Sequence, residues 1–206
     1  KLVRKALSLS IDRERITSKV LKGGQLPAFS FTPPDPLNYF PPTKLDFNPE
    51  KAKQLLAEAG YTKENPLSFE LLYNTSEGHQ ILAQALQQMW RENLGVQVSL
   101  VNTDWKVYLS RQSSGDFDVA RAGWIGDYED PKSFLDMMVT GRGNNQTGWS
   151  NKAYDDLLIK AANSSSQDQR FAYMYQAEEI LMDELPIIPV YTYTRIYMLH
   201  NTIKGW

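Results

Sequence analysis

An acidic loop that follows a predicted strand holds the residues best suited to chemistry. The stretch 121–131 reads Arg-Ala-Gly-Trp-Ile-Gly-Asp-Tyr-Glu-Asp-Pro, with Asp127, Glu129 and Asp130 within four positions. Open α/β sheets bind ligands where strands pass into loops, and a carboxylate there can hold a cationic group, transfer protons or bind a hard cation. Taken alone, the pattern favours a structural role slightly, in which Asp127 and Asp130 cap a helix that begins at Pro131 and Trp124 lies in the core.

Other chemistry is sparse. The chain has no cysteine, which excludes disulfides, thiolate metal sites and cysteine nucleophiles. It has two histidines, His79 and His200, and neither a Gly-x-Ser-x-Gly motif nor a glycine-rich phosphate loop. The sequence therefore favours binding, with a carboxylate-dependent hydrolase using Asp127, Glu129 and Asp130 as the weaker alternative.

The composition predicts a folded protein that does not bind nucleic acid. Hydrophobic residues make up 42% of the chain, and 22 basic against 24 acidic residues give a formal net charge of −2. A nucleic-acid-binding protein normally has a basic excess. The 11 tyrosines and 5 tryptophans suit a core or a wet binding surface. No run approaches the roughly 20 apolar residues that span a bilayer.

The elements that must position the loop alternate between helix and strand. Apolar spacing of three and four predicts helices, and alternation predicts strands. The predicted helices are 1–11, a second helix capped by Asp12, 49–60, 77–93, 104–110, 131–139, 152–162 and 167–184. The predicted strands are 67–73, 96–101, 118–124 and 187–198. Residues 25–48 contain six prolines and are predicted to be packed, extended coil.

This order indicates an α/β fold, a mixed sheet flanked by helices. The strands 67–73 and 96–101 with their helix form a β-α-β unit, for which a parallel crossover is the default. The last predicted strand carries Tyr191 and Tyr193 in alternation, either as sheet packing or as the wall of a pocket. The chain begins inside a predicted helix without an initiating methionine or signal peptide, so we expect a fragment of a longer protein.

Five stretches in order resemble the second lobe of oligopeptide-binding proteins of ABC importers, in extracellular solute-binding protein family 5. They are 3–13 (Val-Arg-Lys-Ala-Leu-Ser-Leu-Ser-Ile-Asp-Arg), 52–61 (Ala-Lys-Gln-Leu-Leu-Ala-Glu-Ala-Gly-Tyr), 71–76 (Leu-Leu-Tyr-Asn-Thr-Ser), 117–124 (Phe-Asp-Val-Ala-Arg-Ala-Gly-Trp) with Asp127-Tyr128, and 187–191 (Ile-Ile-Pro-Val-Tyr). The resemblance spans nearly the whole chain.

The resemblance implies that residues 1–206 form a single α/β lobe of a type II periplasmic-binding-protein-like fold, with the N-terminal lobe absent. It implies an oligopeptide ligand, the permease subunits of an ABC transporter as partners, and no cofactor, metal or enzymatic activity. The implied location is outside the cytoplasmic membrane, with a lipid on the missing N-terminus as one form of anchor. Dipeptides, murein peptides, nickel chelates and sugars are alternative ligands, and pheromone sensing is an alternative role.

The resemblance also implies roles for ten residues. Asp127 matches the aspartate that pairs with the peptide α-ammonium, and Gly123 and Ile125 match positions whose backbone pairs with the peptide. Side-chain pockets and walls are implied for Trp105, Trp124 and Tyr193. The residues implied near the peptide carboxylate are Asn74, His79, Arg121 and Arg111. The family pattern has its basic residue one position after Arg111, where Gln112 stands, so either the turn shifts or carboxylate recognition differs.

Overall fold

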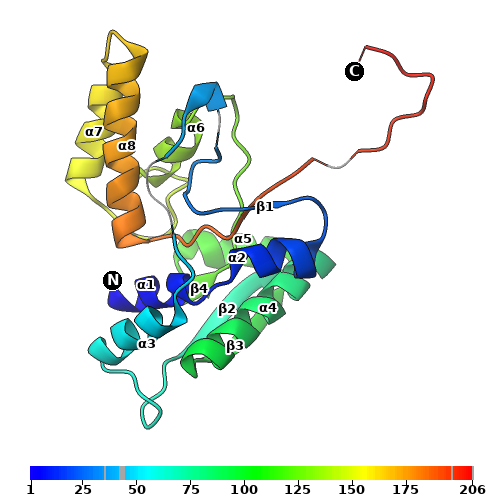
Figure 1. Cartoon of the computed structure of the whole chain (residues 1–206), viewed down its shortest axis with the longest axis vertical. Coiled ribbons are helices and arrows are strands. Elements are labelled where there is room, and N and C mark those ends of the chain that lie inside the picture. Colours follow the sequence, from blue (N-terminus) through cyan, green and yellow to red (C-terminus); the bar gives the residue numbers. More distant parts are fainter. Residues whose placement is uncertain (35, 42–44, 196, 206) are drawn as a thin grey trace.

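Residues 68–103 form the β-α-β unit that the sequence predicts. The computed structural model describes residues 1–34, 36–41, 45–195 and 197–205. Strand β2 (Ser68–Asn74) runs into helix α4 (Glu77–Leu94) and then strand β3 (Gln97–Thr103). The two strands are parallel and in register from Ser68 opposite Gln97 to Asn74 opposite Thr103. Figure 1 shows α4 lying along this sheet.

The third strand is much shorter than predicted. Strand β4 (Val119–Ala120) pairs parallel with β2 on the side away from β3, so the order is β3-β2-β4. The predicted strand 118–124 was wrong in its second half. Arg121 N still donates to Leu72 O at 2.8 Å, but the backbone of residues 122–126 makes no hydrogen bond within the described part of the chain. The chain leaves the sheet there.

The antiparallel pairing lies in a separate sheet. Strand β1 (Leu26–Pro27) pairs with strand β5 (Tyr191–Thr192) as a two-stranded antiparallel ribbon. The α/β class is confirmed, but the two strand directions are divided between two sheets. Among the described residues of the predicted strand 187–198, which exclude residue 196, only β5 forms, because its partner belongs to the proline-rich segment and prolines limit the ladder. Residues 197–205 leave the body as a tail (Figure 1).

One hydrophobic cluster joins the sheet to the N-terminal helices. Helix α1 (Leu2–Leu9), a π-helical turn (Ile16–Leu21) and helix α3 (Pro49–Glu58) supply it together with α4. The short turn α2 (Arg13–Arg15) precedes the π-helical turn. The predicted caps are confirmed: Asp12 accepts from Arg15 N at 2.8 Å and Asn48 from Lys51 N at 3.0 Å. Trp90 of α4 is buried here and donates from Nε1 to Leu7 O at 3.0 Å.

A second hydrophobic cluster holds the proline-rich segment. It is built by α6 (Lys132–Leu135), a 3-10 turn (Asp136–Met138), α7 (Lys152–Ala162) and α8 (Gln167–Glu184), and a further 3-10 turn (Pro36–Asn38) lies in the segment. The fully buried Glu178 of α8 accepts from Thr32 N at 2.8 Å and from Tyr39 Oη at 2.9 Å. The expected packing is therefore confirmed for the described residues of this segment; residues 35 and 42–44 lie outside them.

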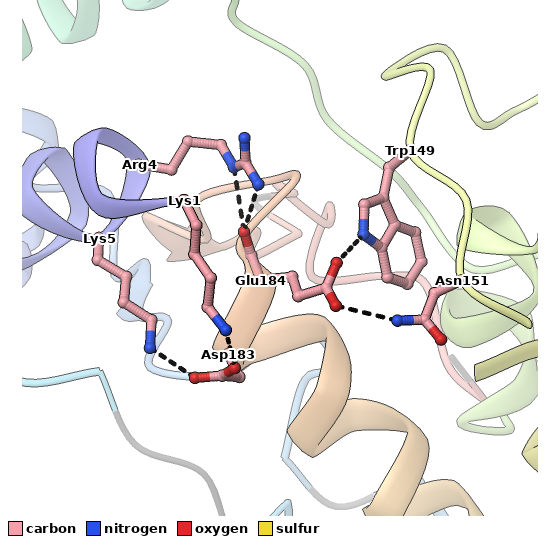
Figure 2. A network of polar contacts seen from close by, with 7 residues as sticks. All are labelled: Lys1, Arg4, Lys5, Trp149, Asn151, Asp183 and Glu184. Carbon is pink, nitrogen blue, oxygen red and sulfur yellow. Dashed lines mark hydrogen bonds and ion pairs between the residues drawn. The ribbon is translucent and has the colours of Figure 1, made fainter. Parts of the chain in front are cut away.

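The two clusters are tied together where α8 ends against α1. Lys1 and Lys5 pair with Asp183, and the Arg4 guanidinium donates to the backbone oxygen of Glu184 at 2.9 and 3.0 Å (Figure 2). The Glu184 carboxylate accepts from Trp149 Nε1 at 2.6 Å and Asn151 Nδ2 at 3.0 Å. These contacts of Asp183 and Glu184, together called the latch, fix the α7–α8 hairpin relative to α1. None of the described helices has the length and apolar character needed to cross a membrane.

Candidate binding site

The carboxyl edge of the parallel sheet gathers four of the residues predicted to bind. Asn74 ends β2, Arg121 directly follows β4, and Asn74 lies opposite Thr103 at the end of β3. His79 lies in the first turn of α4, and Trp105 begins helix α5 (Trp105–Ser114), which follows β3. Because parallel strands end at one edge, these side chains converge where α/β sheets bind ligands.

Arg121 is the centre of this group. Its Nη2 donates to the Tyr193 hydroxyl, and its guanidinium carbon lies 5.9 Å from the centre of that ring. Tyr108 donates to Arg121 O at 2.5 Å and stacks on Trp105 with ring centres 5.4 Å apart. Arg121 Nε is buried and has no hydrogen-bond partner among the described residues. An arginine held in this way keeps donor capacity for an anion.

His79 lies beside this arginine. Its Nδ1 is 2.8 Å from Asn74 Oδ1. Burial lowers the pKa of His79 and the positive charge of Arg121 lowers it further, while the hydrogen bond with Asn74 acts in the opposite direction. Burial likewise raises the pKa values of Tyr108 and Tyr191, so both phenols remain protonated at neutral pH. The group thus carries one fixed positive charge surrounded by neutral donors.

Gly123 allows the ribbon to approach the loop. A Cβ atom at this position would lie 2.5 Å from the Tyr193 hydroxyl, closer than any side chain tolerates. The absence of a side chain therefore places the Tyr193 ring directly against the loop backbone. Ile125, two residues later, is 76% exposed, and Trp105 is 58% exposed. Both offer apolar surface to a ligand.

Asp127 lies in a second part of the site. It lines a cavity of about 220 Å³, whose wall consists of Trp124, Asp127, Tyr128, Ser133, Asp136, Met137, Arg142, Gly143 and Asn144. Its backbone N donates to Ser133 Oγ at 2.8 Å, but its carboxylate has no hydrogen bond or ion pair within the described residues. The carboxylate is therefore available to a guest.

The capping role belongs to Asp130. Asp130 Oδ1 accepts from Lys132 N at 2.8 Å, at the start of α6, and from Arg170 Nη2 at 2.6 Å. The structural alternative is thus correct for Asp130 and wrong for Asp127. Glu129 lines a separate open cavity of about 720 Å³ on the proline-rich side, together with Pro33, Pro34, Gly126, Tyr128, Asp130, Phe134 and Arg195.

Arg111 stands apart from the other predicted residues. Its Nε donates to Asp116 Oδ2 at 3.0 Å and to Asp116 O at 3.1 Å, and its Nη2 lies 3.6 Å from Glu70 Oε2. The carboxylates of Asp116 and Glu70 therefore neutralise Arg111. Arg121 is left as the positively charged residue of the group at the sheet edge. The described residues hold no cluster of three or more acidic, histidine or cysteine side chains able to bind a metal ion.

Two residues of the site were not predicted. Tyr108 follows Trp105 at helical spacing, a signal that was present but is equally typical of core packing. Ser133 contacts Trp124 and Asp127 from within a predicted helix, and nothing in its local sequence indicates this. Both act through contacts between elements.

The sequence of this chain is similar to those of known binding proteins. The family model for bacterial extracellular solute-binding proteins, family 5 (Middle), matches residues 1–146. The periplasmic murein peptide-binding protein MppA of Escherichia coli is 42% identical over 99% of this chain, and the periplasmic oligopeptide-binding protein OppA of Salmonella typhimurium is 41% identical over 99%. The chain spans 39% of the length of each of these relatives.

Solved structures agree. The structure of the E. coli murein tripeptide-binding protein MppA superimposes with a TM-score of 0.89 at 42% identity, over 93% of this chain and 39% of that one. Haemophilus influenzae OppA in complex with RPPGFSPFR gives a TM-score of 0.88 at 37% identity, over the same shares of the two chains. The type II periplasmic-binding-protein-like fold class is confirmed. By sequence and by fold, this chain belongs to the bacterial extracellular solute-binding proteins, family 5.

Proposed function

We propose that this chain is the second lobe of a two-lobe protein that binds oligopeptides outside the cytoplasmic membrane and delivers them to an ABC importer. The names of the relatives support this ligand class and location: two are periplasmic murein peptide- and oligopeptide-binding proteins, and a third is a dipeptide-binding protein. The relatives' greater length supports a further lobe that completes the site. The protein's role is binding and handover rather than catalysis.

The single observation that carries the proposal is the unpartnered carboxylate of Asp127. A peptide has an ammonium group at one end and a carboxylate at the other. Asp127 faces a cavity with no partner within the described chain, and Arg121 lies at the sheet edge with Asn74 and His79 beside it. Charge-assisted hydrogen bonds at the two ends then bind the groups that peptides share, whatever their sequence.

The loop backbone supplies the middle of the proposed site. The N–H and C=O groups of residues 122–126 are unpaired within the described chain, and Gly123 and Ile125 lie among them. A peptide added along this segment as an extended strand satisfies these groups without reading side chains. Trp105, Trp124 and Tyr193 then form the walls around the guest's side chains, and bridging waters allow those side chains to vary.

Calorimetry on the longer, two-lobe protein tests the proposal. Asp127→Asn is titrated with a short peptide and with its N-acetylated form, and Glu129→Gln serves as the matched acidic control. We expect Asp127→Asn to weaken binding of the free-amine peptide at least about 30-fold, since removing one partner of a charge pair costs about 2 kcal/mol or more. Equal affinity of the wild-type protein for the two peptides, or equal losses in both variants, contradicts the role of Asp127.

A further inference from the structure

Ser133 holds the acidic loop through two different groups. It is the second residue of α6 and only 5% exposed. Its hydroxyl oxygen accepts from Asp127 N at 2.8 Å, and its backbone oxygen accepts from Trp124 Nε1 at 2.8 Å. One buried residue therefore binds both the residue proposed to pair with the peptide amine and the tryptophan proposed to line a pocket.

The chain between these two contacts is shaped to fit Ser133. A Cβ atom on Gly126 would lie 3.2 Å from Ser133 Oγ and 3.0 Å from Phe134 Cε2. Glycine at this position lets the loop lie closely against the start of α6, which keeps the hydrogen bond to Asp127 short. Both the Ser133 hydroxyl and the absence of a side chain at Gly126 therefore favour the hydrogen bond to Asp127 N.

A second tie anchors the base of the loop but not its tip. Asp130 caps α6 and pairs with Arg170 of α8 at 2.6 Å, in a pair whose side chains are 17% and 22% exposed. This pair fixes where α6 begins. It makes no hydrogen bond with residues 122–126, whose backbone is unpaired within the described ranges. Ser133 is therefore what connects the anchored helix to the free segment.

We infer that Ser133 is a positioning residue for recognition of the peptide amine, an inference that rests on the proposed function. By holding Asp127 N, its hydroxyl orders the backbone from which the carboxylate projects before the guest arrives. A pre-ordered carboxylate spends less of its interaction energy on loop ordering. Without the hydroxyl, the Trp124 contact persists because it uses the Ser133 backbone oxygen. Loss of the hydroxyl should therefore weaken the amine contact selectively.

The test compares two substitutions in the two-lobe protein. Ser133→Ala removes the hydroxyl, whereas Ser133→Cys keeps a side chain of similar size whose sulfur is a weak acceptor. None of the 206 residues of this lobe is a cysteine, so the variant cannot form a disulfide within the lobe. Ser150→Ala, at an exposed loop position, is the matched control. The measured quantity is the ratio of affinities for a free-amine peptide and its N-acetylated form, by calorimetry.

We expect both Ser133 variants to lower this ratio about five- to tenfold, by weakening only the free-amine peptide, and Ser150→Ala to leave it unchanged. A wild-type ratio in either Ser133 variant overturns the inference, and a loss in Ser133→Ala alone assigns the residue to packing. Equal weakening of both peptides also overturns it. If the wild-type protein itself shows no preference for the free amine, the proposed function of Asp127 fails and the inference with it.

Discussion

The guanidinium of Arg121 donates a hydrogen bond to the hydroxyl of Tyr193, 72 positions further along the chain. Arg121 leaves the parallel sheet and Tyr193 leaves the antiparallel ribbon, so this bond joins the two sheets at the site. It holds the arginine from one side, while the buried Nε has no partner within the described residues. The orientation of the proposed carboxylate-binding cation therefore depends on a tyrosine from the other sheet.

Tyr193→Phe tests this dependence. The substitution keeps the ring against Gly123 but removes the acceptor for Arg121. We expect affinity for a peptide with a free carboxylate to fall about three- to tenfold, the net contribution of one ordinary hydrogen bond, and affinity for the amidated peptide to stay unchanged. Tyr61→Phe, remote from the site, is the control. If both peptides weaken alike in calorimetry, Tyr193 contributes wall surface alone.

Protonation of His79 should strengthen binding of a carboxylate. The lowered pKa keeps His79 neutral in the free protein. A nearby guest carboxylate favours the charged ring and raises this pKa, so the complex binds more protons than the free protein. Affinity should then rise several-fold between pH 7 and pH 5.5, a range below the titration of the peptide amine.

Titration calorimetry in buffers of different ionisation enthalpy measures this proton uptake. His79→Gln should abolish it, and His200→Gln, which changes the other histidine, should preserve it. Proton uptake that persists without His79 would contradict the assignment. The stability of the free protein depends on pH in the opposite direction to the affinity. The unfolded chain has the higher histidine pKa and binds more protons, so acidification from about pH 6.5 downward destabilises the fold.

Glu178 should make the protein less stable as pH rises above the ordinary pKa of a glutamate carboxyl. Burial raises the pKa of this carboxyl above its ordinary value. The folded state therefore retains a proton that the unfolded chain has released, and stability is lost as pH rises through the raised pKa. Glu178→Gln keeps an acceptor for Thr32 N and cannot ionise, so we expect its stability to change less between pH 5 and pH 8.

Urea denaturation at the two pH values measures this difference. Glu178→Ala serves as the contrast, because it leaves the Thr32 N–H and the Tyr39 hydroxyl without their partner. It should cost about 2–5 kcal/mol at either pH. Parallel pH profiles for the wild-type protein and Glu178→Gln would show that Glu178 does not titrate in this range.

The latch in Figure 2 should depend on Glu184 far more than on Asp183. Glu184→Ala removes the acceptor of both Trp149 Nε1 and Asn151 Nδ2, and we expect it to lower the free energy of unfolding by about 1–3 kcal/mol. Asp183→Asn weakens ion pairs whose acid is 54% exposed, so its effect should stay below about 1 kcal/mol. Equal losses in chemical denaturation would contradict this ranking.

The sequence predicts those helices, strands and caps that depend on residues close together in the chain. The alternation in 67–73 and the helical spacing of 77–93 specify the β-α-β unit, and Asp12 and Asn48 cap their helices as predicted. Strand 118–124 reads as a full strand, because its side chains do not reveal that β2 offers only two paired positions to β4. Strand β1 was missed since prolines mask a short pairing that depends on Tyr191, far along the chain.

The site divides in the same way. The family resemblance implies that Asn74 and Arg121 lie near the same end of the ligand, and the structure brings them together where β2 and β4 end. Asp127 and Asp130 are equivalent as sequence, both acids shortly before a helix. The capping bond from Lys132 N and the ion pair with Arg170, 40 residues further on, show that Asp130 is engaged and Asp127 is not. The contact with Arg170 arises from packing between elements that are far apart in the sequence, and the sequence alone does not reveal it.

The unpaired backbone at 122–126 has a consequence for handling the lobe by itself. Unpaired backbone N–H and C=O groups in an extended segment can form hydrogen bonds with another extended chain, including another copy of the same segment. The exposed acids Asp127 and Glu129, just beyond it, oppose such self-association, because two copies brought edge to edge would crowd like charges together. Replacing both acids with neutral residues should therefore promote aggregation of the isolated lobe through this segment.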